Sequence, residues 1–191
     1  MRFAAGADLV NNGSVTRLVA GPIGRTVVRI VLIAVVAVAV AYLAFLRPMQ
    51  MQWGSTAVER TRPMPGDQVI GSATFVATRA ITIDASREEV WPLIERMGRR
   101  ERFFVKGFEA NRYLLWLTRS APRLSWCWAL EAVGSRRTRL VTRVRFRHPW
   151  LSSEIVSVLV ADVRNGFAVR DAMLDVKVQA ESASKKGRTR P

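Results

Sequence analysis

The sequence has few of the residues on which most catalytic and metal sites depend. Among its 191 residues there are one cysteine and one histidine. The single Cys127 excludes an internal disulfide and any multi-cysteine metal site, so cysteine usage says nothing about the cellular compartment. His148 has no second imidazole and no carboxylate cluster at ligand spacing, which disfavours a metal or general-base role. We therefore expect no metal and no cofactor, and an inert thiol at Cys127.

The short motifs of common enzyme classes are missing as well. The sequence contains no glycine-rich phosphate loop, no dinucleotide-binding fingerprint and no nucleophile elbow. Glu88, Glu89 and Glu95 lie on a predicted helix whose other face is apolar, which is typical of solvated charges. No polar pair stands out for cyclase or dehydratase chemistry. We predict no catalytic residue, and an enzyme is the less favoured interpretation.

Lysine is also scarce, so arginine supplies nearly all of the net charge of +15. A balance this basic suits anionic lipid head groups or nucleic acid. The alternative is a bias towards Arg and Ala across a GC-rich bacterial genome, because the arginines are scattered along the chain. Scattered arginines without a recognised binding motif are weak evidence for nucleic-acid binding, and we expect no nucleic-acid partner.

One long apolar run dominates the first quarter of the chain. No residue from Ile30 to Leu46 is charged. A helix of about 20 residues is about 30 Å long, which matches the hydrocarbon core of a bilayer. A helix also pairs its own backbone groups in lipid, whereas a lone strand leaves them unpaired. We predict a single-pass membrane helix over residues 26–47, which places the protein in the cell membrane.

Two other interpretations of this run stay open. A cleaved signal peptide could use the small residues of Ala37–Ala44, although the leading segment of about 29 residues and the run itself are long for one. A buried core helix is rarely apolar on all sides over such a length. Arginines flank both ends, so the positive-inside rule gives only a slight preference for a cytoplasmic amino terminus. These arginines are Arg17, Arg25, Arg29, Arg47, Arg60 and Arg62.

The rest of the chain is predicted to form an arm, a linker, one domain and a tail. Residues 1–25 show little hydrophobic periodicity and are predicted to be disordered. Residues 48–72 are polar and broken by prolines, which is typical of a linker that lifts a domain off the membrane. The domain spans residues 73–181. Residues 182–191 are predicted to be a disordered basic tail that either contacts anionic lipid or only aids solubility.

Within the domain, the periodicity predicts a strand, a helix and four more strands. Ser86-Arg-Glu-Glu89 is a capping box, and it opens a helix with one apolar stripe. That stripe consists of Val90, Leu93, Ile94 and Met97. The strands are predicted at 74–83, 103–108, 112–118, 124–131 and 139–147. The last strand should be exposed on one face, since every second residue from Arg139 except Val141 is polar or charged.

A long C-terminal helix follows at about 150–181, with a kink at Asn165-Gly166. Seven apolar residues fall near one of its faces, and this spacing predicts the helix. They are Leu151, Ile155, Leu159, Val163, Phe167, Leu174 and Val178. The alternative is a hairpin, because Asn-Gly is a strong two-residue turn signal.

This order of elements resembles the helix-grip fold of the START and birch-pollen-allergen superfamily, most closely its bacterial polyketide cyclase-like branch. The matching segments are Arg62–Asp67, Ala77–Ala85, Glu89–Ile94 with Met97-Gly98, and more loosely Asp171–Glu181. The resemblance implies an α+β domain in which a curved antiparallel sheet wraps the last helix and encloses a cavity for an apolar ligand. The family usually has six or seven strands. Only about five are predicted here, so this would be a shortened, membrane-anchored variant with a small cavity or none.

The sequence thus predicts a membrane-anchored, non-enzymatic domain that binds a hydrophobic small molecule or lipid between the sheet and the last helix. Aromatic residues are the candidates to line this cavity: Trp91, Phe104, Trp116, Trp126, Trp128 and Phe167. Trp126 and Trp128 are two residues apart in a strand and therefore share a face. The alternative is that these side chains are ordinary core residues of a membrane-tethered interaction module without a pocket. A continuous void of about 300–1,000 Å³ would favour ligand binding. The sequence makes no prediction of oligomeric state.

Overall fold

The structure is a computed structural model that describes residues 22–97, 103–118, 124–147 and 155–188. The chain divides into two compact units, Met1–Leu46 and Arg47–Pro191. Most of the predicted disordered arm, residues 1–25, lies outside the described residues.

The first unit contains the predicted membrane helix. It comprises α2 (Pro22–Ala41) and the π-helical η1 (Tyr42–Leu46), and the second unit begins with α3 (Arg47–Met51). The helical stretch Pro22–Met51 has a mean hydropathy of 2.7 in its most apolar window, and none of that window is buried. The helix is therefore long and apolar enough to span a membrane, and its exposure argues against a core helix. A signal sequence would meet the same criteria of length and composition.

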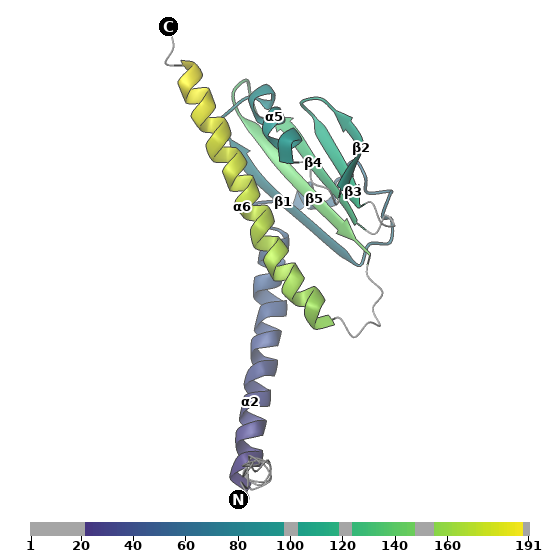
Figure 1. Cartoon of the computed structure of the whole chain (residues 1–191), viewed down its shortest axis with the longest axis vertical. Coiled ribbons are helices and arrows are strands. Elements are labelled where there is room, and N and C mark those ends of the chain that lie inside the picture. The colour runs from purple at the N-terminus through teal and green to yellow at the C-terminus, as the bar shows by residue number, and fades with distance from the viewer. Residues whose placement is uncertain (1–21, 98–102, 119–123, 148–154, 189–191) are drawn as a thin grey trace, which may run out of the picture. The chain divides into compact units, whose positions relative to one another are not determined.

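The second unit is built on a five-stranded antiparallel sheet in the order β1-β5-β4-β3-β2 (Figure 1). All five predicted strands are confirmed, with no end shifted by more than one residue. They are β1 (Phe75–Ile83), β2 (Phe103–Glu109), β3 (Tyr113–Thr118), β4 (Leu124–Ala132) and β5 (Thr138–Phe146). β1 and β2 form the edges of this sheet.

Two helices pack on one face of the sheet, as predicted for a helix-grip arrangement of the α+β class. These are α5 (Arg87–Met97), between β1 and β2, and α6 (Ile155–Arg188), after β5. The predicted capping box opens α5. The Ser86 N–H donates to Glu89 Oε2 at 2.8 Å, and the Glu89 N–H donates to Ser86 Oγ at 3.4 Å. Val90 and Ile94 of the predicted stripe are fully buried.

α6 is one helix that continues through Asn165-Gly166, so the hairpin alternative is wrong. It also extends to Arg188, which corrects the prediction of a disordered tail from residue 182. The reason is that Val176, Ala180 and Ser184 repeat at i+4 spacing and are all buried. The last turns of the helix are therefore held by packing.

The face of α6 that packs on the sheet differs from the stripe that the sequence singled out. Val169, Met173, Val176 and Ala180 are buried, whereas Phe167 is 46% exposed and Val178 is 64% exposed. The helix carries two apolar stripes, and spacing alone does not decide which one meets the sheet. The buried stripe continues to Gly166, where an added Cβ would lie 3.3 Å from Gln50 Oε1 and 3.5 Å from Arg79 Nη2.

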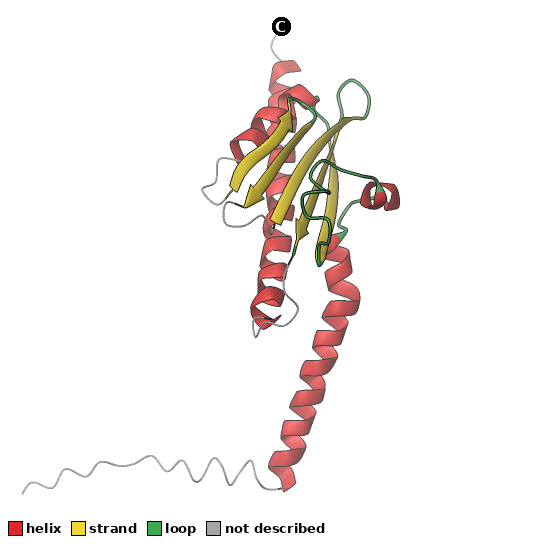
Figure 2. Ribbon diagram, turned by 90° about the vertical axis from the view of Figure 1, so that its right-hand side faces the viewer, coloured by secondary structure: helices red, strands yellow, loops and turns green. Residues whose placement is uncertain are grey.

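Residues 54–73, predicted to be mostly linker, instead pack on the opposite face of the sheet; we call them the belt (Figure 2). Met64 and Ile70 are 4% and 2% exposed, and Met64 joins a second apolar cluster with Cys127 and Val141. Gly54 has a φ of +65°, and a Cβ there would lie 2.1 Å from the carbonyl oxygen of Ala80. Only glycine permits this close approach of the belt to β1.

The arginines of β5 fasten the belt to the sheet, so the prediction that this face of the strand is exposed is wrong. Val141 is fully buried and Arg143 is 3% exposed. Arg143 donates to Thr78 Oγ1 at 3.0 Å and to Asp67 Oδ2 at 2.7 Å. It also donates to the backbone carbonyls of Glu59, Arg60 and Arg62. A guanidinium can be buried when its donors find acceptors, and the belt supplies them.

Candidate functional site

Three tryptophans meet on the face of the sheet that the helices cover. The ring centroids of Trp116 and Trp126 are 5.3 Å apart, and those of Trp126 and Trp128 are 5.2 Å apart. Trp116 is 2% exposed and Trp128 is fully buried, in one cluster with Met173 and Val176 of α6. These side chains therefore fill the space between sheet and helix in which the sequence placed the ligand.

The other three candidate aromatics divide between this cluster and other surfaces. Trp91 of α5 is partly buried and packs against the cluster. Phe104 pairs with Leu117, the neighbour of Trp116 in β3, so it lies on the face of the sheet opposite the tryptophans. Phe167 is half-exposed on α6. The structure thus brings Trp91 together with the three clustered tryptophans, and it places Phe104 and Phe167 elsewhere.

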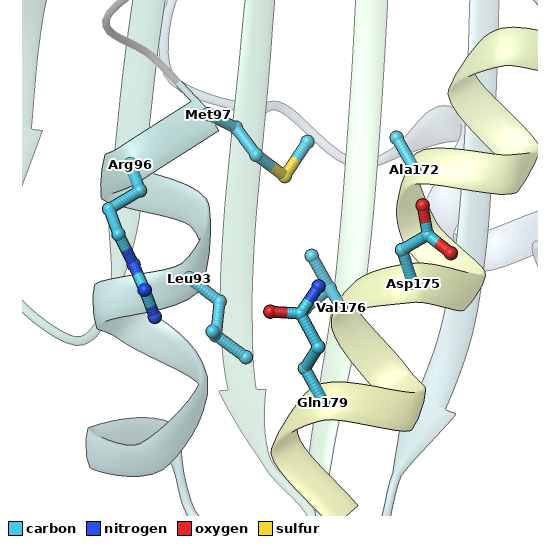
Figure 3. Close-up of a pocket in the computed structure, with 7 residues that line it drawn as sticks. All are labelled: Leu93, Arg96, Met97, Ala172, Asp175, Val176 and Gln179. Atoms are coloured by element: carbon cyan, nitrogen blue, oxygen red, sulfur yellow. The ribbon is translucent and has the colours of Figure 1, made fainter.

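A groove of about 360 Å³ lies between α5 and α6 (Figure 3). Leu93 and Met97 of α5 face it, and both pack against the tryptophan cluster. On α6 it is lined by Ala172 and Val176, of which Val176 is a core residue. One wall of the groove is thus apolar and is formed by the outer side of the core.

Three polar side chains complete the lining, namely Arg96, Asp175 and Gln179. Arg96 lies along α5, where its Nε donates to the Pro92 carbonyl at 3.1 Å (Figure 3). Asp175 and Gln179 come from α6, one turn apart. The groove therefore offers apolar contact together with one cation and one carboxylate.

The spacing of these residues explains why they meet. Leu93, Arg96 and Met97 are at positions i, i+3 and i+4 of α5, which share one face of a helix. The four α6 residues follow the pattern i, i+3, i+4 and i+7. The small side chain of Ala172 leaves space between the helices. From the sequence, Leu93 and Met97 are predicted only as core positions, because no local sequence pattern indicates that α5 and α6 lie side by side.

Two kinds of reactive centre, a metal cluster and an activated thiol, are absent from the described residues. Within the described ranges, no group of three or more His, Cys, Asp or Glu residues could hold a metal ion. Cys127 is buried on the belt side of the sheet, where burial and, to a lesser degree, the nearby carboxylate of Asp67 raise its pKa to about 12. Its thiol is therefore protonated at neutral pH and is not a nucleophile.

No family model and no curated protein sequence matches the chain. Among solved structures, it is similar to a polyketide cyclase-like protein from Corynebacterium glutamicum, with 14% identity, a TM-score of 0.41, and 60% of this chain and 93% of that chain covered. An aromatase/cyclase from Streptomyces is 13% identical, with a TM-score of 0.41 and coverages of 60% and 96%. A START superfamily protein from Mycobacterium smegmatis is 10% identical, with a TM-score of 0.39 and coverages of 55% and 97%. These families are the ones that the sequence resembles. At such identities and TM-scores, no activity and no residue role carries over to this chain.

Proposed function

We propose that the chain is a membrane-anchored, non-enzymatic binding domain for a hydrophobic small molecule or lipid, whose apolar part lies in the α5–α6 groove. The observation that supports this most is the groove itself, of about 360 Å³ with Leu93, Met97 and Val176 in its lining. Ligand sites are commonly clefts of about 300–1,000 Å³ with apolar walls and a few polar groups. Arg96 at its edge suits an acidic head group.

The membrane anchor in this proposal is the apolar helix within Pro22–Met51. Its length, its mean hydropathy of 2.7 and its lack of burial support a bilayer span. A domain tethered to the bilayer stays close to any ligand dissolved in it, which raises the effective concentration of that ligand. Anchor and groove thus serve the same function in this proposal.

A second candidate function is a membrane-tethered interaction module without a small-molecule ligand. The specific observation in its favour is that Trp116, Trp128 and Met173 fill the space between the sheet and α6. In that case the α5–α6 groove would be a shallow surface feature.

The two candidates differ in whether the purified protein takes up a hydrophobic probe. We would use the full chain in detergent, because a shorter domain starting at residue 60 would lose the first residues of the belt, Glu59 among them. A fluorescent fatty acid should bind it, and native mass spectrometry should detect bound lipid after gentle purification. No bound species and no probe uptake would rule out the ligand-binding proposal.

A matched pair of variants tests the location. Ala172→Trp adds a large side chain inside the groove and is expected to weaken probe binding at least about tenfold. Ser182→Trp adds the same side chain at an exposed position of the same helix, outside the groove lining, and should leave binding unchanged. Equal binding by wild type and Ala172→Trp would place the probe elsewhere.

A further inference from the structure

We propose that the domain docks on the bilayer surface and recognises anionic lipid head groups through one end of its sheet. We call this end the basal surface and define it by Arg47, Val69, Phe75, Val76, Arg145 and Arg147. The inference rests on the proposed membrane anchor and adds a lipid contact outside the α5–α6 groove.

Chain connectivity limits how far the basal surface can lie from the end of the apolar run. Arg47 directly follows Leu46, the last residue of the apolar run. The carbonyl of Gln50 already accepts from Arg79 Nε of β1 at 2.8 Å, and that of Trp53 accepts from the Ala80 N–H at 3.0 Å. From Leu46 to Gln50 is four residues (50 − 46), which span at most about 14 Å even when fully extended. The sheet therefore cannot be far from the point at which the run leaves the bilayer.

The residues of the basal surface are linked to one another. The guanidinium carbon of Arg47 lies 5.7 Å from the centroid of the Phe75 ring. Next to Phe75, Val76 pairs with Arg145 of β5. Arg145 Nε donates to the Ile70 carbonyl at 3.0 Å, which holds the part of the belt that contains Val69. These contacts hold cations and apolar groups at one end of β1 and β5.

The chemistry of this surface matches the interfacial region of an anionic bilayer. Val69 and Val76 are 39% and 37% exposed, and Arg147 is exposed, with its Nε bonded to the Ser72 carbonyl at 3.2 Å. Arginine forks bind phosphate in a bidentate manner, and valines can enter the head-group boundary beside them.

The basal surface also keeps a net positive charge. Arg145 of this surface is paired with the carboxylate of Asp67, which lies 3.8 Å from its Nη1. That carboxylate is shared with Arg143, to which it lies closer at 2.7 Å. One carboxylate shared between Arg143 and Arg145 does not neutralise the guanidinium groups of these two residues and of Arg147, so anionic head groups are the complementary partner.

The test uses the full chain in lipid nanodiscs of phosphatidylcholine, alone or with about one third phosphatidylglycerol. An environment-sensitive fluorophore is attached at Val69→Cys or, as a control, at Ser135→Cys in the exposed hairpin at the other end of β5. Cys127 is 3% exposed and does not compete for the label. We expect a blue shift and reduced iodide quenching for the Val69 label in anionic discs only. The Ser135 label should show neither change, and about 1 M salt should reverse the effect by screening.

The variants Arg47→Gln and Arg147→Gln should each weaken the anionic-lipid dependence about fivefold. Arg136→Gln, an exposed arginine of the distal hairpin, is the matched control and should have no effect. An unshifted Val69 label in anionic discs, or an equal shift in both disc types, would overturn the proposed recognition.

Resistance of the chain to carbonate extraction is measured in parallel. Extraction of the wild-type chain would instead show that the anchor, and thus the proposed function, is wrong.

Discussion

The two faces of the sheet are buried by opposite means. On the helix face, an apolar cluster of tryptophans, α5 and α6 excludes water, and Trp128 and Met173 are fully buried. On the belt face, the arginines of β5 reach across to backbone carbonyls and to Glu59 and Asp67. The first face is held mainly by non-directional packing, whereas the second adds directional hydrogen bonds between charged and polar groups to a smaller apolar cluster.

The helix face therefore contributes most of the stability of the domain, whereas the belt face specifies how the domain is connected to the anchor. Apolar burial contributes most of the folding free energy, whereas a buried ion pair often contributes little compared with a hydrophobic replacement. A half-satisfied polar network is nevertheless costly, because its remaining groups stay buried without partners. The belt should therefore be sensitive to the loss of one partner while adding little net stability.

The largest expected effect is on the helix face. Trp128→Ala should lower the unfolding free energy by about 3–5 kcal/mol, since it leaves a large cavity in the core. Trp128→Phe is the matched control: the indole Nε1 has no hydrogen-bond partner among the described residues, so its loss leaves no partner unpaired. All six tryptophans follow residue 47, so urea unfolding followed by their fluorescence reports on the domain alone. Equal losses for both variants would show that packing volume is not what holds this face.

On the belt face, Arg143→Met should cost about 3 kcal/mol, because it removes the closest charged donor of Asp67 and leaves several buried carbonyl oxygens without theirs. The double variant Arg143→Met/Asp67→Asn should recover part of this loss, since the unpaired charge is gone. The same urea unfolding measures both variants. A double variant no more stable than the single one would contradict the assignment of the cost to the unpaired carboxylate.

The two faces also differ in how far the sequence predicts them. Strand alternation, the Ser86 capping box and the Val90–Ile94 stripe are local patterns, so the five strands and α5 were predictable. The burial of Arg143 depends on carbonyls of residues 59, 60 and 62, which the sequence places far from β5. Alternating arginines therefore predicted an exposed face, and the proline-rich segment predicted a free linker.

The sequence predicted which tryptophans share a face, but not the groove beside them. Aromatic spacing correctly placed Trp126 and Trp128 on one face. The α5–α6 groove depends on which face of α6 meets the sheet, and two apolar stripes on this helix compete for that role. Both stripes repeat at helical spacing, so periodicity alone does not decide which of them faces the sheet.

A third prediction concerns acid sensitivity of the belt face. Arg139 lowers the pKa of the Glu59 carboxyl group from 4.5 to about 2 through its hydrogen bonds and its charge. Its Nε lies 2.7 Å from Glu59 Oε1. The folded state thus binds fewer protons than the unfolded state between these values, so its stability falls as the pH drops from about 5 towards 2. The loss amounts to about 2–3 kcal/mol. Glu59→Gln should flatten this part of the curve of unfolding free energy against pH. An unchanged slope in that variant would show that other carboxyl groups cause the loss.

The smallest effects compare the two helix caps, one on each face of the sheet. Ser86 caps α5 on the helix face, and Thr56 caps α4 (Ala57–Thr61) in the belt, where its Oγ1 accepts from the Glu59 N–H at 3.2 Å. Ser86→Ala and Thr56→Ala should each cost about 1 kcal/mol in global unfolding. Hydrogen exchange should distinguish the two variants. Thr56→Ala is expected to speed exchange in the belt alone, because the short helix α4 is stable only while Glu59 is held in position for its ion pair with Arg139. Ser86→Ala should act only through the core, since Val90 and Ile94 anchor α5 there. Faster exchange spread evenly over the domain in Thr56→Ala would mean that the belt and the core unfold as one cooperative unit.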